Sequence, residues 1–200
     1  MDKQPNPMNV FSQSKLINNL YPMFRYSCRF GICMNLCLNM AYYLGKKRGN
    51  GDEALSELKL QHQRTFNTQA IGHLVYSYGF TKLEKETEAI ELSMGLQNID
   101  NIAIKEPIVF DAMSYDIEKI TKYAEKNNII LNTFTMEKGA HATLTRIYMK
   151  NNTPTLWHFD PNFGVIEDVC NKENAQKLMY SIQQVYNPKF YEWFPISYKN

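Results

Sequence analysis

Three residues far apart in the chain are of the types that form a thiol nucleophile with its base and an orienting acid: Cys33, His141 and Asp160. The thiolate is the reactive form of cysteine, and the first turn of a helix stabilises it through backbone N–H groups and the positive end of the helix dipole. Cys33 stands at the start of a predicted helix. His141 would take the thiol proton, and Asp160 would hold the imidazole in one tautomer and stabilise its cation.

The histidine and the acid are predicted to lie on the two strands of one β-hairpin. Two runs rich in β-branched and aromatic residues, 140–149 and 155–160, flank Asn151 and Asn152. Asparagine tolerates the left-handed backbone conformation that tight hairpin turns require. The segment therefore predicts a hairpin with these two asparagines as its turn.

This turn determines which residues face each other. Asp160 lies opposite Thr143, and His141 is two residues away on the same face, diagonal to the carboxylate. The other face is apolar and carries Ala140, Ala142, Leu144, Trp157 and Phe159. A slip of one residue would separate the imidazole from the carboxylate and mix apolar with polar side chains, so both patterns favour the same register.

The helix that begins beside Cys33 is predicted from an apolar stripe between Ile32 and Leu44, where the residues of one face recur at three- and four-residue steps. Cations and glycines in 45–49 end it. Other helices are predicted at 14–20, 52–64 (with Asp52 as N-cap), 68–77, 114–126 and 174–186, and strands at 107–110, 129–136 and 189–198, with Pro195 at an edge or a bulge. The segment 80–105 predicts an extended piece followed by a surface excursion.

This order of elements is typical of an α+β fold, with helices first, then an antiparallel sheet formed largely by the second half, and one helix returning over the sheet. With 200 residues, 44% of them hydrophobic, the chain can bury one substantial core. We predict a single catalytic domain over 14–200, preceded by a flexible arm over 1–13 that contains Pro5 and Pro7.

The composition excludes several classes of function. A net charge of +2 gives no reason to expect a nucleic-acid partner, and no apolar stretch approaches the length of a membrane span or resembles a Sec signal. The four cysteines, Cys28, Cys33, Cys37 and Cys170, lack the spacing of a disulfide framework or a zinc site. We therefore expect reduced thiols and neither a metal nor another cofactor.

Each of these residues taken alone has a structural interpretation. A cysteine on an apolar stripe often fills a core, and the Asp-Pro pair that contains Asp160 is common turn chemistry. The combination favours catalysis. His158 shares the predicted face of the site and is interpreted as a supporting or substrate-lining residue. Ser27, Asn162 and the backbone N–H of Cys33 are secondary candidates for contacts with the substrate or its oxyanion.

Three motifs stand in order along the chain: Gly31-Ile32-Cys33 at a helix start, Gly139-Ala140-His141-Ala142, and Phe159-Asp160-Pro161-Asn162-Phe163-Gly164. Together they resemble the YopT/AvrPphB-type cysteine peptidases, bacterial effectors of the papain-like clan, and the Asp-Pro-Asn-aromatic-Gly run is the most specific part. The resemblance implies a papain-like fold with Cys33 as nucleophile at the start of a central helix packed on an antiparallel sheet. It also implies His141 as general base and acid, and Asp160 as the orienting residue.

The resemblance further implies a virulence factor or toxin: a soluble, secreted effector that reaches the host-cell cytoplasm without a Sec signal, with a monomer favoured. Such enzymes cleave host proteins, among them lipidated Rho-type GTPases and kinases. The chain departs from the family after the nucleophile, where Met34-Asn35-Leu36-Cys37-Leu38 stands in place of small residues and a tryptophan.

Two other functions are compatible with the same residues or fold. A glutamine or asparagine deamidase of host proteins, such as Rho-family GTPases, would form the same thioester by attack on a side-chain amide. A non-catalytic binding module would keep the fold without an activated thiol.

Overall fold

The computed structural model describes residues 9–20, 22, 32–60, 68, 70–78, 85–111 and 129–199. Contacts within the chain divide it into two compact units. Met1–Phe11 and Pro107–Pro195 form the first, here called the sheet unit; Ser12–Glu106 and Ile196–Asn200 form the second, here called the helical unit. The sequence predicts one domain over 14–200, whereas the contacts define two units. A single catalytic domain formed by the two units together stays a prediction.

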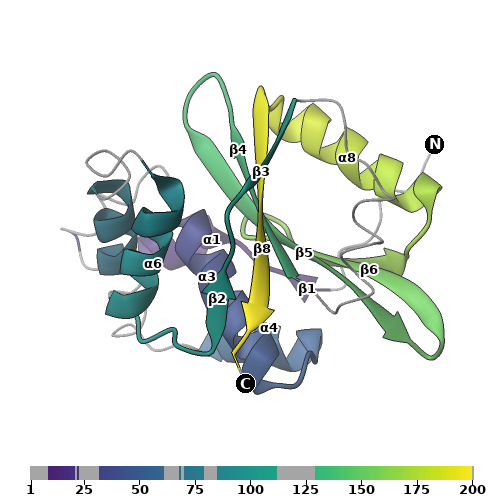
Figure 1. Ribbon diagram of the computed structural model, residues 1–200, viewed down its shortest axis with the longest axis horizontal. Coiled ribbons are helices and arrows are strands. Elements are labelled where there is room, and N and C mark those ends of the chain that lie inside the picture. Colours follow the sequence, from purple (N-terminus) through teal and green to yellow (C-terminus); the bar gives the residue numbers. More distant parts are fainter. Residues whose placement is uncertain are drawn as a thin grey trace. The chain divides into compact units, whose positions relative to one another are not determined.

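The sheet unit is built on a β-sheet (Figure 1). Its strands are β1 (Asn9–Val10), β3 (Ile108–Asp111), β4 (Ile129–Thr135), β5 (Ala140–Lys150), β6 (Thr153–Asp160), β7 (Gly164–Val169) and the first part of β8 (Phe190–Tyr198). The strands lie in the order β1-β7-β6-β5-β4-β8, and β3 also pairs with β8. The pairs from β4 to β7 are antiparallel, which confirms the predicted α+β class with an antiparallel sheet.

The hairpin of β5 and β6 has the predicted turn and register. Asn151 and Asn152 both adopt left-handed conformations, with φ of 50° and 61°. The pairing runs from Lys150 opposite Thr153 to Leu144 opposite Phe159. Because side chains alternate between the two faces of a strand, this register puts His141 and Asp160 on one face.

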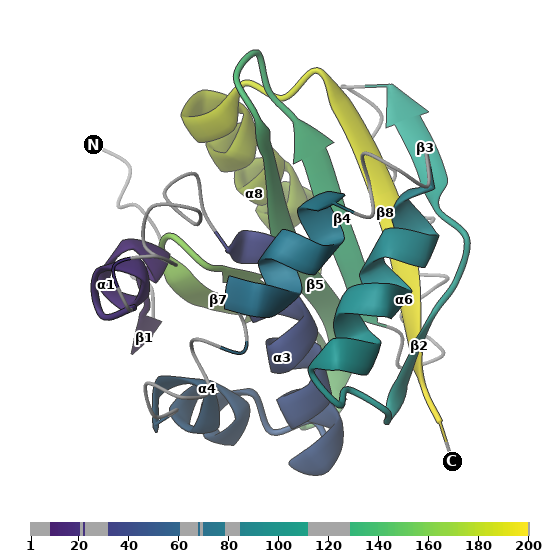
Figure 2. The same cartoon turned by 90° about the vertical axis from the view of Figure 1, so that its left-hand side faces the viewer.

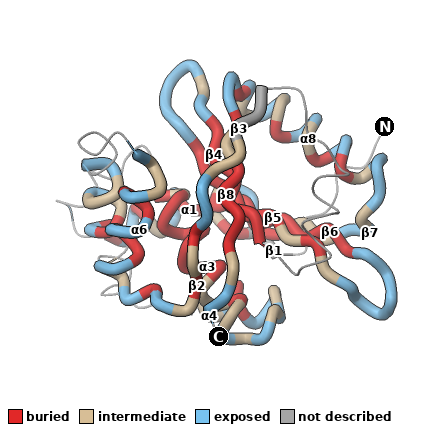
Figure 3. The backbone as a smooth tube through the Cα atoms, in the orientation of Figure 1, coloured by how far each residue is buried: buried red, intermediate tan, exposed pale blue. Residues whose placement is uncertain are grey.

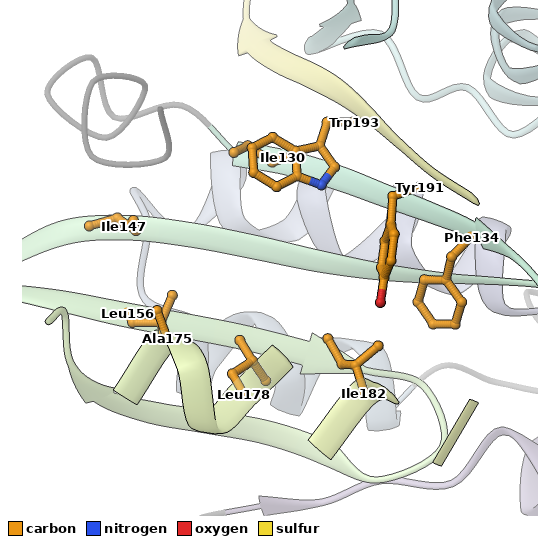
Figure 4. Packing of buried hydrophobic residues seen from close by; sticks show 9 residues of the cluster. All are labelled: Ile130, Phe134, Ile147, Leu156, Ala175, Leu178, Ile182, Tyr191 and Trp193. Atoms are coloured by element: carbon orange, nitrogen blue, oxygen red, sulfur yellow. The ribbon is translucent and has the colours of Figure 1, made fainter. Parts of the chain in front are cut away.

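Helix α8 (Lys172–Tyr186) covers that face of the sheet. Asn171 caps its start by accepting a hydrogen bond from the Asn174 N–H at 2.8 Å, and Asn187 ends it in a left-handed conformation. Figure 4 shows the apolar side of the helix pointing into the core. The buried core residues are Ile130, Phe134, Ile147, Leu156, Ala175, Leu178, Ile182, Tyr191 and Trp193.

The helical unit contains α1 (Gln13–Asn18), α3 (Cys33–Lys46), α4 (Gly51–Leu60), helical residues 70–78, and α6 (Glu86–Leu96) (Figure 2). A short strand, β2 (Ile102–Ile104), pairs with the last three residues of β8, which belong to this unit. The helices are therefore concentrated in the first half of the chain, as predicted.

Helix α3 is buried along most of its length, and its inner turns are red in Figure 3. This agrees with the apolar stripe that predicts it. The helix ends where Arg48 and Gly49 adopt positive φ angles of 50° and 83°, and the Gly49 N–H donates to the carbonyl of Leu44. The predicted end of the helix within 45–49 is thus confirmed.

Two predictions for the first half are wrong. The described part of 80–105 contains α6 and β2 instead of an extended piece and a surface excursion. The buried residues of α6 are Ala89, Ile90, Ser93 and Met94, whose small and polar members weaken the apolar periodicity. The cap of α4 is Asn50 and not Asp52, because Asn50 Oδ1 accepts from the Glu53 N–H at 3.2 Å.

Residues 9–13 are the described part of the predicted flexible arm over 1–13, which stays a prediction. Asn9 and Val10 pair with β7, and the buried ring of Phe11 packs on Phe159 with 5.4 Å between centroids. Gln13 begins α1. The buried ring of Phe11 therefore anchors these described residues, and residues 1–8, with both prolines, lie outside the described residues.

Pro195 is not at an edge of the sheet but at a one-residue shift in the pairing register of β8, which agrees with the second predicted position, a bulge. Within the sheet unit, β8 lies between β4 and β3. Pro195 falls between the residues that pair with β3 and those that pair with β2, where a residue without an N–H is tolerated. The predicted helix at 114–126 and the candidate Ser27 lie outside the described residues.

Two glycines at matching positions, each one residue before a helix end, allow a test of packing in the helical unit. A Cβ at Gly45 of α3 would lie 2.5 Å from the Tyr198 ring, whereas a Cβ at Gly95 of α6 meets nothing within 4 Å. We expect Gly45→Ala to lower the free energy of unfolding by roughly 1–3 kcal/mol. Gly95→Ala should raise it by roughly 0.5–1 kcal/mol. Urea unfolding measures both, and equal effects would contradict the packing at Gly45.

Candidate functional site

His141 and Asp160 form a buried hydrogen-bonded pair. Nε2 of His141 lies 3.0 Å from Oδ1 of Asp160, and the two residues are 4% and 5% exposed. A carboxylate only accepts hydrogen bonds, so Nε2 carries the proton in this pair. In the neutral ring Nδ1 is then the basic nitrogen, the atom at which the imidazole can take a proton. The predicted proximity of the two side chains is confirmed, and their catalytic roles stay predictions.

The turn after β6 fixes the carboxylate. Asp160 pairs with Gly164, and only residues 161–163 connect the two strands. The Asn162 N–H donates to Asp160 Oδ1 at 2.8 Å, and the Phe163 N–H donates to the Asp160 carbonyl at 3.1 Å. Gly164 has a φ of 108°, a conformation that favours glycine. The Asp-Pro-Asn-aromatic-Gly run is therefore a turn sequence that orients its own acid.

Tyr186, the last residue of α8, also contacts the pair. Its Oη donates to Asp160 Oδ2 at 2.8 Å and accepts from Asn162 Nδ2 at 2.9 Å. Its ring stacks on the His141 imidazole with 4.5 Å between centroids and 23° between planes. Phe134 packs edge-on against the same imidazole at 5.4 Å. Asn162, a secondary candidate for substrate contact, thus supports the acid through both its backbone and its side chain.

The electrostatic balance at Asp160 favours the carboxylate. Burial by itself raises the pKa of this carboxyl group. The hydrogen bond and charge of His141, with the N–H of Asn162, outweigh burial and hold the pKa of Asp160 below its ordinary value. The acid is therefore charged at neutral pH and stabilises a protonated imidazole beside it.

His158 lies on the same face but has different partners. Its Nδ1 is 2.9 Å from the Thr145 hydroxyl, which also accepts a hydrogen bond from Asn132 at 2.8 Å. Burial is the largest influence and, against the opposing charge of Asp160, lowers the pKa of His158 to about 4. The ring is 2% exposed and neutral at pH 7, which fits a supporting residue better than a substrate-lining one.

Cys33 is the first residue of α3 and is half-buried. The N-cap residue Ile32 supplies no side-chain acceptor to the first turn, so its N–H groups are not capped from that position. The Ile32 N–H itself donates to Oε1 of Gln13 at 2.9 Å. A carboxamide is therefore anchored one residue from the thiol. The sequence carries no signal for Gln13, because it lies 19 positions before Ile32 in a segment predicted to be part of an arm.

The predicted site residues belong to different units. His141, His158, Asp160 and Asn162 are in the sheet unit, and Cys33 is in the helical unit. The structure brings the histidine and the acid together, and the approach of the Cys33 sulfur to the imidazole stays a prediction. Cys33 and Cys170 are free thiols.

Two features are absent from the described residues. Among them, no three His, Cys, Asp or Glu side chains are grouped closely enough to hold a metal ion. No helix in the described ranges has the length and apolar character needed to cross a bilayer.

The fold is similar to that of a solved Pseudomonas protein. The crystal structure of the Pseudomonas avirulence protein AvrPphB aligns with 83% of this chain and 91% of its own chain, with a TM-score of 0.56 and 14% sequence identity. No protein-family model and no curated protein matches the sequence. At this identity the similarity shows the fold alone. AvrPphB is one of the two proteins that give their names to the family that the sequence resembles.

The buried neutral His158 predicts a loss of stability in mild acid. Its pKa is about 4 in the folded chain and about 6.5 when unfolded, so between pH 7 and pH 5 only the unfolded chain gains a proton there. The free energy of unfolding should fall by about 2 kcal/mol over this range from His158 alone. His158→Asn should remove that part of the fall.

Urea unfolding of both proteins at pH 7 and pH 5 measures the difference. At pH 7, His158 is neutral in the folded and the unfolded chain. The difference in free energy of unfolding between the two proteins at pH 7 is therefore the cost of the lost ring, without the pH effect. The same pH-dependent loss in the two proteins would contradict a buried, neutral His158.

Proposed function

We propose that the chain is a cysteine peptidase of bacterial effector type that cleaves host proteins, with a papain-like arrangement of Cys33, His141 and Asp160. The observation that carries the proposal is the buried hydrogen bond between His141 Nε2 and Asp160 Oδ1, which makes Nδ1 the basic nitrogen of the neutral ring. Two facts support it: Cys33 begins a helix, and the fold is similar to that of AvrPphB.

In this mechanism His141 Nδ1 takes the proton from the Cys33 thiol. The thiolate attacks the carbonyl carbon of the peptide, and the imidazolium then donates its proton to the leaving amine as the C–N bond breaks. Water, deprotonated by His141, hydrolyses the resulting thioester and releases the acid product and the thiol. Asp160 keeps Nε2–H in place and stabilises the imidazolium in both halves of the reaction.

The oxyanion of each tetrahedral intermediate needs N–H donors near the sulfur. The backbone N–H of Cys33 is one, since the first turn of a helix has no intrahelical acceptor for it. Gln13 is a second donor in this proposal, because the hydrogen bond from the Ile32 N–H to its Oε1 holds its carboxamide one residue from the nucleophile. The role of the secondary candidate Ser27 is thereby assigned to Gln13.

The substrate in this proposal is a protein of a eukaryotic host, and a lipidated small GTPase or a kinase is the class that the family resemblance suggests. The enzyme would act in the host cytoplasm as a soluble monomer, without metal or cofactor. The same thiol and base would also attack a side-chain amide, and a binding module would need neither. The experiments below separate these three functions.

The first experiment measures activation of the thiol by alkylation with iodoacetamide near neutral pH. We expect Cys33 to react at least about tenfold faster than Cys170, which is also half-buried, because Cys33 is the first residue of a helix and has a base in this proposal, whereas burial raises the pKa of Cys170. His141→Ala should remove this advantage and leave the rate of Cys170 unchanged. Equal rates for the two thiols in the wild-type chain would favour a binding module.

The second experiment tests that the two units act as one site. In a chain with Cys28, Cys37 and Cys170 replaced by serine, His141→Cys should form a disulfide with Cys33 under mild oxidation, because the mechanism requires the two side chains to meet. Tyr180→Cys, on the exposed side of α8, is the matched control and should not cross-link. Peptide mass spectrometry detects the bond, and its absence would contradict the triad.

The third experiment identifies the reaction. A eukaryotic cell lysate incubated with the enzyme should gain new protein N-termini, detected by N-terminal labelling and mass spectrometry, and Cys33→Ala should produce none. Deamidation would instead replace a side-chain amide by a carboxylate in an uncut protein. Gln13→Ala should slow cleavage by about 10²-fold, mainly in kcat.

A further inference from the structure

We propose that Tyr186 is a positioning residue for this site, one that holds the Asp160 carboxylate and the His141 ring in the geometry of a general base. The inference rests on the proposed function. It is carried by two independent contacts of one side chain: a hydrogen bond to the acid and a stacking contact with the base.

The direction of the hydrogen bond follows from the donors present. Asn162 Nδ2 is a donor, so the Tyr186 oxygen accepts from it, and the single hydroxyl hydrogen is left for Asp160 Oδ2. His141 and the Asn162 N–H occupy the other carboxylate oxygen. With both oxygens engaged, the carboxylate cannot rotate away from the imidazole.

The stacking contact fixes the plane of the ring. Tyr186 lies nearly parallel to the imidazole, and Phe134 packs against both rings, at 5.4 Å from His141 and 5.1 Å from Tyr186. This enclosure keeps water from competing for the hydrogen bond between the base and the acid. The electron-rich face of the tyrosine also favours the imidazolium that forms during the reaction.

The position of Tyr186 is set by the packing of α8 as a whole. Ala175, Leu178, Ile182 and Tyr186 recur at three- and four-residue steps, so they lie on one face of the helix. Figure 4 shows the first three inserted into the core. Asn187 then ends the helix in a left-handed conformation immediately after the tyrosine. The packing of α8 therefore places the phenol of Tyr186 beside the His141–Asp160 pair.

The test compares Tyr186→Phe, which keeps the ring, with Tyr186→Leu, which removes it. Tyr180→Phe, on the exposed side of the same helix, is the control. The first readout is the rate of Cys33 alkylation by iodoacetamide, with Cys170 as internal reference. The second is the exchange with water of the His141 Nε2–H proton, followed by NMR in a chain with ¹⁵N-labelled histidine, where His141→Gln assigns the signal.

We expect Tyr186→Phe to slow alkylation of Cys33 by about tenfold and to speed exchange of the Nε2–H proton by a similar factor, because a hydrogen bond to a charged group is lost. Tyr186→Leu should have larger effects on both. Tyr180→Phe should change neither. A general loss of structure would also change the alkylation rate of Cys170. A constant Cys170 rate therefore excludes it.

Where His141→Ala slows alkylation of Cys33, a wild-type value of either readout in Tyr186→Phe overturns the proposal. The proposed function has its own test, because it fails if His141→Ala leaves the rate of Cys33 unchanged. In that case proton exchange alone decides the role of Tyr186: faster exchange in Tyr186→Phe upholds positioning of the pair, and unchanged exchange overturns it.

Discussion

The hydrogen bond between His141 and Asp160 is the interaction on which this face of the sheet depends. A buried carboxylate is costly unless each oxygen has donors, and here the donors come from a strand, a turn and a helix. Removing any one would leave a charged group short of a partner. The polar site and the stability of the sheet unit are therefore coupled, and variants of Asp160 are expected to change both.

Two features of the backbone place this bond. The two asparagines of the tight turn fix the register of β5 and β6, and a shift of one residue would send His141 to the opposite face. The turn at 161–163 then holds Asp160 at the end of its strand. Since both features are short and local, the pair is specified by about two dozen residues of sequence.

This locality explains what the sequence could predict. The hairpin, α3 and α8 have strong periodicity and turn signals within their own segments. Helix α6 has weak apolar contrast, and its prediction fails for that reason. Gln13 and Tyr186 act through contacts with residues 19 and 26 positions away, respectively, and neither residue type nor spacing marks them. Only the fold brings Gln13 and Tyr186 next to the residues that they contact.

The two histidines of this face show how partners decide chemistry. His158 is bonded to the hydroxyl of Thr145, and burial lowers its pKa to about 4, so it remains neutral throughout the physiological range. His141 is bonded to a carboxylate whose own pKa is lowered, so a proton gained at Nδ1 is stabilised by a neighbouring charge. A base for a thiol must hold its proton through an intermediate and then release it. Of the two, only His141 has the partner for this, which is the physical reason for placing it beside Cys33 in the mechanism.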